Sequence, residues 1–155
     1  MDKKYACYCG LYCENCAVKV KVEPAAKTLL NEMTKLGFGE IISFFPNGEK
    51  FWEFLKNIST KGICTSCKEG SGNPACKVKL CAKEKNIEMC AFCKSYPCEF
   101  FNDLFEGYPM LKHDNWILKE KGWRAWEKTQ AKYQTEGVGF SYTKTTEKSD
   151  KNIES

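Results

Sequence analysis

Apolar residues recur at helical spacing in two segments of the first half of the chain. The first segment begins at Pro24, which suits the first turn of a helix, and ends at Gly37, a common helix terminator. Its apolar positions are Ala25, Leu29, Leu30, Met33 and Leu36. The second begins at Asn47, a favourable N-cap residue, and its apolar positions are Phe51, Trp52, Leu55 and Ile58. These stripes predict two helices within residues 17–63 that pack their apolar faces in the core.

Three shorter helices are predicted in the second half of the chain. Pro97 suits the first turn of one of them, which ends at Gly107. Its apolar face consists of Phe100, Phe101, Leu104 and Phe105. The other two cover roughly 111–119 and 123–133. No segment alternates polar and apolar residues for long enough to predict a substantial sheet, so the expected fold class is mainly α with little β structure.

Eleven of the 155 residues are cysteines, in two blocks on either side of the first two predicted helices. Six of them form CxxC pairs, which let two sulfurs reach one metal from a tight turn. The single histidine, His113, excludes sites built from paired cysteines and histidines and most histidine-based catalysis. The pattern predicts all-thiolate metal sites. The candidate ligands are Cys9, Cys13, Cys16, Cys64, Cys67, Cys76, Cys81, Cys90, Cys93 and Cys98.

The ends and the apolar stretches of the chain bear on its compartment. The charged N-terminal residues are not followed by an apolar segment, and the longest apolar stretches are far too short to span a bilayer. We therefore expect a cytoplasmic protein without membrane association. Disulfides are rare in a reducing cytoplasm, and an odd number of cysteines fits a disulfide framework badly, which favours metal ligation. Zinc and iron–sulfur clusters both accept four thiolates, so zinc is the expected cofactor and an iron–sulfur cluster its alternative.

The charge pattern adds two points. The net charge of +4 is weakly basic, and Arg124 is the only arginine. Because arginine is the usual reader of bases and phosphates, nucleic acid is an unlikely partner. Between Cys76 and Cys93 the chain carries four lysines and two glutamates. Lysines near thiols lower the pKa of a cysteine and offset the negative charge of four thiolates around zinc, although a solvated surface explains them equally well.

Three other readings of the cysteines have less support. Cys9, Cys13 and Cys16 have the CxxxCxxC spacing of a radical SAM cluster, but the chain is too small for the usual barrel. A thioredoxin-type redox pair needs a βαβ context, which the sequence lacks. A cysteine nucleophile needs a histidine partner, and His113 lies in a polar stretch typical of a surface helix start.

The order of the cysteine motifs carries a family resemblance. The motifs are Cys9-Gly10-Leu11, Cys13-Glu14-Asn15-Cys16, Cys64-Thr65-Ser66-Cys67, Cys76, Cys81-Ala82, Cys90-Ala91-Phe92-Cys93 and Tyr96-Pro97-Cys98-Glu99. Over roughly residues 5–133 the chain resembles the domain-of-unknown-function 3795 family of small bacterial and archaeal proteins. Ten cysteines fit the family pattern, whereas Cys7 is extra and is expected to be a spare thiol. The segment 38–59 is longer than the family usually carries. The resemblance implies a cysteine-rich domain that binds metal, most simply zinc, and it supplies no substrate.

These observations predict one cysteine-rich metal-binding domain over residues 1–135, followed by a polar, flexible tail over 136–155. The ten cysteines divide most simply into two sites of four with two left over. We expect the N-terminal block to join Cys90, Cys93 and Cys98, and the other four cysteines of the middle block to form the second site.

Three classes of function follow from this prediction. The leading one is a zinc-stabilised module that binds a protein partner. An iron–sulfur redox or catalytic protein and a nucleic-acid-binding zinc protein are the alternatives, and the sequence leaves open whether the protein is an enzyme.

Overall fold

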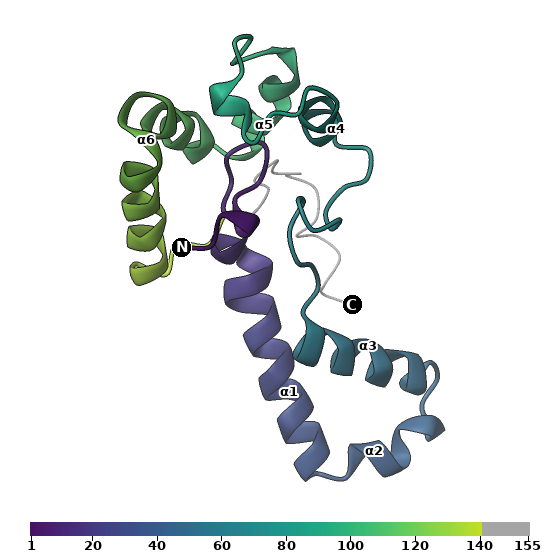
Figure 1. The fold of residues 1–155 in the computed structure, drawn as a ribbon. Coiled ribbons are helices and arrows are strands. Elements are labelled where there is room, and N and C mark those ends of the chain that lie inside the picture. The colour runs from purple at the N-terminus through teal and green to yellow at the C-terminus, as the bar shows by residue number, and fades with distance from the viewer. Residues whose placement is uncertain (141–155) are drawn as a thin grey trace.

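The computed structural model describes residues 1–140 and confirms the mainly helical fold class (Figure 1). Its α-helices are α1 (Glu23–Lys35), α2 (Phe38–Ile41), α3 (Gly48–Lys61), α4 (Lys77–Glu84), α5 (Asn102–Gly107) and α6 (Met110–Thr135). Two isolated bridges, Ala6 with Tyr12 and Cys16 with Phe140, are the only β pairings within that part of the chain. Helix α1 leads away from the cysteine-bearing loops, and α2 and α3 turn the chain back toward them (Figure 1).

The two helices predicted in the first half are confirmed as α1 and α3, but their apolar stripes are only partly buried. Ala26, Leu55 and Ile58 form the buried cluster between the helices. Four residues that the spacing assigned to the packed faces are exposed instead: Ala25, Leu29, Leu36 and Phe51. Only two helices and a short connection cover this cluster, so each helix can bury a narrow stripe at most.

The N-terminus of α3 differs in detail from the prediction. Asn47 is the N-cap residue, but it has a left-handed backbone with φ of 58°, and its side chain accepts no capping hydrogen bond. Asparagine is among the few residues that adopt this conformation readily. Asparagine therefore suits this position because it tolerates a left-handed backbone, and not because its side chain caps the helix.

The predicted helices of the second half are also present. Pro97 lies before the helical residues and not in their first turn, since Cys98 is the N-cap of a short 3-10 helix, Glu99–Phe101, which leads into α5. The predicted segments 111–119 and 123–133 are the two halves of α6. Gly122 separates them with φ of 77° and ψ of 179°, values that break the helix and that glycine adopts without a steric penalty.

The main core joins three parts of the chain that are far apart in the sequence. Ala6 and Tyr12 from the N-terminal loop pack with Met89 and Ala91 against α6. The Tyr12 ring meets the fully buried Trp126 ring edge-on at 5.7 Å between centroids, a favourable aromatic geometry. The N-terminal loop is therefore packed against the C-terminal helix.

A second cluster lies on the other side of the loops. Its buried members are Val78, Phe101 and Leu111, and several cysteine side chains pack against it. This cluster fixes α4, the short 3-10 helix and the start of α6 around the cysteine-bearing segments.

A buried polar network ties the first CxxC loop to α6. Asn15, between Cys13 and Cys16, donates its amide to the backbone and side-chain oxygens of Gln130 at 3.1 and 3.0 Å. Gln130 in turn donates to the Asp114 carboxylate at 2.9 Å. Because buried polar groups are costly unless they are hydrogen-bonded, these contacts specify how α6 docks.

The first residues of the predicted tail contact the same loop. The Phe140 amide donates to the Asn15 carbonyl at 2.9 Å, and the Phe140 carbonyl accepts from Ala17 at 2.8 Å. Residues 141–155 of the predicted tail lie outside the described residues.

The first prediction concerns Tyr133, whose hydroxyl donates to the Asp114 carboxylate at 3.0 Å. Burial and the neighbouring carboxylate raise the pKa of Tyr133 to about 12, above the value of about 10 expected in the unfolded chain. The unfolded state therefore loses this proton first, and the contribution to stability is lost between about pH 10 and about pH 12. We expect the difference in unfolding free energy between wild type and Tyr133→Phe to be constant below that range and to shrink within it. Urea unfolding of both proteins at stepped pH measures it, and a constant difference up to pH 12 would contradict the prediction.

Candidate metal centres

The first two cysteines, Cys7 and Cys9, are carried by a tight loop over residues 6–12. The Cys7 amide donates to the Leu11 carbonyl at 2.7 Å, and Gly10 donates back to Cys7 at 3.0 Å. Gly10 has φ of 101°, and a Cβ at this position would collide with the Asn115 side-chain amide. Asn115 donates to the Cys9 carbonyl at 2.7 Å. The loop therefore needs glycine both for its backbone and for the close approach of α6.

The first group of thiols gathers around Cys7. Its Sγ lies 3.2 Å from the Cys13 Sγ, and its thiol also forms a hydrogen bond with Cys67. The hydrogen bond from Cys7 lowers the pKa of Cys13 and, with help from the Tyr8 backbone amide and two lysines, lowers the pKa of Cys67 to about 6. The same contacts raise the pKa of Cys7. Cys67 therefore favours the thiolate form at neutral pH, and Cys13 loses its proton more readily than an ordinary cysteine; the thiolate is the state that binds metals.

The second CxxC loop, residues 64–67, is held by its own polar contacts. The buried Ser66 accepts the amides of Ser71 at 2.9 Å and, through its hydroxyl, of Glu69 at 3.1 Å. Cys64 at the start of the loop lies near Cys13 and Cys16. Burial, followed by those two sulfurs, raises the pKa of Cys64. The CxxC pairs 13/16 and 64/67 thus belong to one group of thiols.

These two CxxC loops stand at the base of the helical lobe, which we define as residues 23–61. Cys16 precedes α1 and Cys64 follows α3, so each connection between the lobe and the rest of the chain passes through one of the loops. The Glu23 carboxylate crosses the base and accepts the Ile63 amide at 3.0 Å. The first thiol group therefore lies where the lobe is attached.

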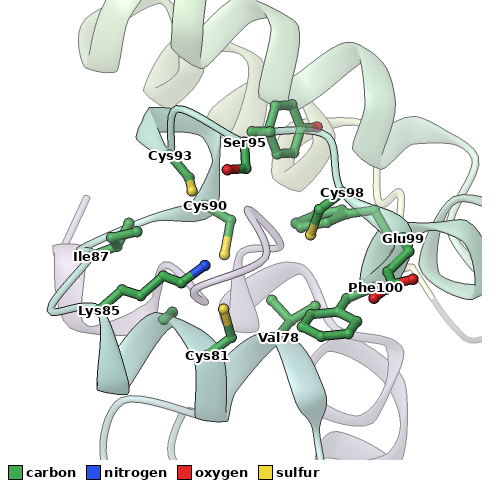
Figure 2. Close-up of a pocket in the computed structure, with 13 residues that line it drawn as sticks. Val78, Cys81, Lys85, Ile87, Cys90, Cys93, Ser95, Cys98, Glu99 and Phe100 are labelled. Carbon is green, nitrogen blue, oxygen red and sulfur yellow. The ribbon is translucent and has the colours of Figure 1, made fainter.

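The second group of thiols lines a cavity of about 190 Å³. Figure 2 shows Cys81, carried by α4, pointing into this cavity from one side, with Cys90, Cys93 and Cys98 from the loops opposite. The 3-10 helix Cys90–Phe92 makes the tight turn that brings the last CxxC pair to the cavity wall. The rest of the cavity wall is largely apolar.

The surroundings of Cys90 oppose ionisation of its thiol in the absence of a cation. Burial, followed by the nearby sulfurs of Cys9, Cys93 and Cys98, raises the pKa of Cys90 to about 12. The Lys85 side chain points into the same cavity (Figure 2), and its interaction with Cys81 raises the pKa of the lysine. A positive charge therefore already lies beside the sulfurs.

The first group holds five of the eleven thiols and the second group four, and two cysteines remain. Cys9 is close to both groups, since it interacts with Cys7 in the first and with Cys90 in the second. Cys76 is the N-cap residue of α4 and packs against the apolar cluster of Val78 and Phe101. Within residues 1–140, no set of three or more cysteine, histidine, aspartate or glutamate side chains is already arranged as a metal-binding cluster.

The structure corrects two expectations about the cysteines. The expected division is wrong for most of the cysteines, because Cys7, Cys13 and Cys16 lie with Cys64 and Cys67, and Cys81 lies with Cys90, Cys93 and Cys98. The expected proximity of the N-terminal block to Cys90 holds for Cys9. Nor is Cys7 a thiol set apart from the others, since it contacts Cys13 directly. The sequence spacing carried no information on which loops pack together.

His113 lies on the surface, as expected. Its side chain is 61% exposed, and its contacts are with the Asp114 carboxylate and the Trp116 ring. Sequence reasoning missed Asn115, which fixes the first cysteine loop, because a lone asparagine within a helix gives no signal of its partner. The sequence did indicate Lys85, because it is one of the four lysines between Cys76 and Cys93.

Comparison with known proteins identifies the family. The profile described as "Protein of unknown function (DUF3795)" matches residues 5–103, which include all eleven cysteines, and the chain belongs to this family. The match ends before α6, so it does not extend to the C-terminal part of the resemblance. No curated protein and no solved structure matches the chain. Among the described residues, no helix is long and apolar enough to cross a membrane.

A substitution at Gly10 tests the first cysteine loop. Gly10→Ala introduces both an unfavourable positive φ and a collision with Asn115, whereas Gly70→Ala introduces a positive φ of 92° in open space. The backbone term costs of order 1–3 kcal/mol in each case. We expect Gly10→Ala to lower the unfolding free energy by more than Gly70→Ala, as measured by chemical denaturation. Equal losses would mean that Asn115 moves aside freely.

Proposed function

We propose that the protein is a zinc-binding module in which two thiolate sites hold the helical elements together and present the lobe to a protein partner. The observation that carries the proposal is the convergence of two CxxC loops at the base of the lobe. Cys16 and Cys64 are separated by the whole lobe in the sequence, yet they belong to the same group of thiols. Two CxxC pairs facing each other are the recurring ligand set of structural zinc.

The first site would use the two CxxC pairs at the base of the lobe. Its proposed ligands are Cys13, Cys16, Cys64 and Cys67. Cys7 would stand beside them as a hydrogen-bond partner of Cys13 and Cys67, a supporting contact of the kind that orients metal ligands. The lowered pKa values of Cys13 and Cys67 support this choice, because zinc binds the thiolate.

The second site would use the four thiols that line the cavity in Figure 2. Its proposed ligands are Cys81, Cys90, Cys93 and Cys98. Four thiolates leave a divalent zinc with a net negative charge, and Lys85 in the same cavity would offset part of it. A bound cation would offset the burial and the nearby sulfurs that raise the pKa of Cys90, so the donor set fits a metal better than it fits free thiols.

A structural role fits the surroundings of both groups. A catalytic zinc site keeps a coordination position open for water or substrate, whereas four thiolates fill a tetrahedral site. The lone histidine is exposed and lies beside Asp114 and Trp116. The metal would therefore stabilise the fold and fix the base of the lobe, and the function would depend on the surface so displayed.

Metal content of cysteine variants tests the ligand assignment. We expect two zinc ions per chain in the wild type, after anaerobic purification and elemental analysis. Cys16→Ser and Cys98→Ser should each retain about one ion, because a three-thiolate site binds zinc far more weakly.

Three matched controls accompany these variants: Cys7→Ser, Cys76→Ser and His113→Ala. All three should retain both ions, because none removes a proposed ligand. If Cys76→Ser lost an ion, Cys76 would have to be assigned as a ligand of the second site. If the wild type contained iron and acid-labile sulfide, the assignment of zinc would be wrong and an iron–sulfur cluster would replace it.

Chelation tests the structural role of the metal. Because metal binding contributes directly to folding free energy, the apo protein should lose its cooperative unfolding transition. Thermal melts followed by circular dichroism, before and after a strong zinc chelator under reducing conditions, measure this. An unchanged melting transition in metal-free protein would refute the proposal.

A further inference from the structure

The first group of thiols holds one sulfur more than a zinc ion binds. A tetrahedral zinc site takes four ligands, and the proposed first site already has them in its two CxxC pairs. Cys7 is the fifth thiol of the group. Its Sγ lies 3.2 Å from the Cys13 Sγ, and its thiol also forms a hydrogen bond with Cys67. A thiol that binds no metal is thus in direct contact with the sulfurs that would bind it.

Cys7 is also the more accessible sulfur of its contact with Cys13. The Cys7 side chain is partly exposed, whereas Cys13 is buried and only 8% exposed. The oxidation of a cysteine depends on access for the oxidant as well as on the ionisation of the sulfur, and coordination to zinc would shield Cys13 further. A small oxidant such as hydrogen peroxide would therefore reach Cys7 first.

The backbone holds Cys7 and Cys13 beside each other before any covalent bond joins them. Ala6 and Tyr12 form an antiparallel bridge, and the two cysteines are the residues that follow its two members. The hydrogen bond from the Cys7 amide to the Leu11 carbonyl, at 2.7 Å, closes the loop between them. A disulfide bond is about 2 Å long, so the two sulfurs need to approach by only about 1 Å. Because the loop is already ordered, a bond between the two sulfurs needs no large rearrangement of the chain.

We propose that Cys7 is a peroxide-reactive site, and that its oxidation joins it to Cys13 by a disulfide bond and thereby releases zinc from the first site. The inference rests on the proposed zinc site at the base of the lobe and adds the regulation of that site. It assigns to Cys7 a chemical role that the ligand set alone does not give it.

The reaction takes two steps. In the first, the Cys7 sulfur attacks one oxygen of hydrogen peroxide, the O–O bond breaks, and Cys7 becomes a sulfenic acid as one water leaves. In the second, the Cys13 thiolate leaves the zinc ion and attacks the sulfenic sulfur, so that the S–S bond forms, the S–O bond breaks and hydroxide leaves. The two sulfurs together lose two electrons, and peroxide gains them as it becomes water and hydroxide.

The disulfide would empty one site and spare the other. Metals bind the thiolate, so a Cys13 held in a disulfide no longer serves as a ligand, and the three remaining thiolates bind zinc far more weakly. Neither Cys7 nor Cys13 lines the cavity of the second site. Oxidation would therefore loosen the base of the lobe, where both connections of the lobe meet, while the second ion stays bound.

Zinc release from the full-length, zinc-loaded protein tests the inference. Hydrogen peroxide is added to the reductant-free protein, and a zinc indicator dye records the released metal. We expect the wild type to release one of its two ions, and dithiothreitol with added zinc to restore it. Cys7→Ser should release the ion at least tenfold more slowly, because the accessible thiol is gone. Cys76→Ser removes another partly exposed thiol outside both proposed sites and should release it at the wild-type rate.

Disulfide mapping identifies the partner of Cys7. Digestion with chymotrypsin and a glutamate-specific protease cleaves after Tyr8, Tyr12 and Glu14, so that Cys7, Cys9, Cys13 and Cys16 lie on separate peptides. After peroxide treatment and alkylation, mass spectrometry of the wild type should find the peptides of Cys7 and Cys13 joined, and dithiothreitol should separate them. A bond from Cys7 to any other cysteine would overturn the inference.

Zinc content and circular dichroism melts before oxidation separate this inference from the zinc proposal. A wild type without zinc would overturn both. A wild type that holds two ions but forms no disulfide between Cys7 and Cys13 would overturn this inference alone, as would equal rates of zinc release from the wild type and Cys7→Ser. If Cys7→Ser is folded but holds only one ion before oxidation, Cys7 is a ligand and its assignment as the reactive thiol is wrong.

Discussion

The attachment of the lobe is the constraint on which the rest of the structure depends. The apolar cluster inside the lobe shares no residue with the other two clusters of the described chain, and residues 59–75 contribute to none of the three. Apolar packing therefore does not fix the lobe relative to the remainder. The lobe is joined to the remainder by the two CxxC loops, by the π-helical residues Val18–Val22 that continue into α1, and by the hydrogen bond between Glu23 and Ile63. A small protein with divided cores needs such a crosslink, and the proposed thiolate–metal bonds would supply one.

The remainder of the molecule is organised around the same loops by ordinary packing and by buried polar contacts. Tyr12 packs against Trp126, and Asn15 reaches Gln130, so the first CxxC loop is fixed to α6 on both sides of Cys13. The break at Gly122 lets the two halves of α6 take different directions, with Asn115 on the first half and Gln130 on the second. Each half can thus contact the N-terminal region at a different point.

The sequence predicts where the helices lie along the chain, but it does not predict which elements pack against one another. Spacing, proline and glycine identify α1, α3 and both halves of α6, because these signals act within a few residues. The division of the cysteines into two groups depends on which loops pack together. The sequence of a CxxC pair is the same whichever other loop it packs against. The spacing of apolar residues did not predict that Phe51 and Leu36 are exposed, for a related reason. An apolar stripe indicates which face of a helix can pack, but it does not indicate which part of the chain packs against that face. Asp114 and Gln130 are polar residues within a helix, and nothing local distinguishes them from solvated ones.

The pairing of Phe140 with the first CxxC loop has a consequence for the order of assembly. All eleven cysteines precede residue 99, so the chain can gather its thiols before the C-terminal half of α6 takes part. The contact between Asn15 and Phe140 joins residues 125 positions apart, and closing so long a loop has a high entropic cost that earlier contacts must reduce. A chain that ends before Phe140 would therefore keep every thiol and lose the two backbone hydrogen bonds that hold Asn15 and Ala17, on either side of Cys16.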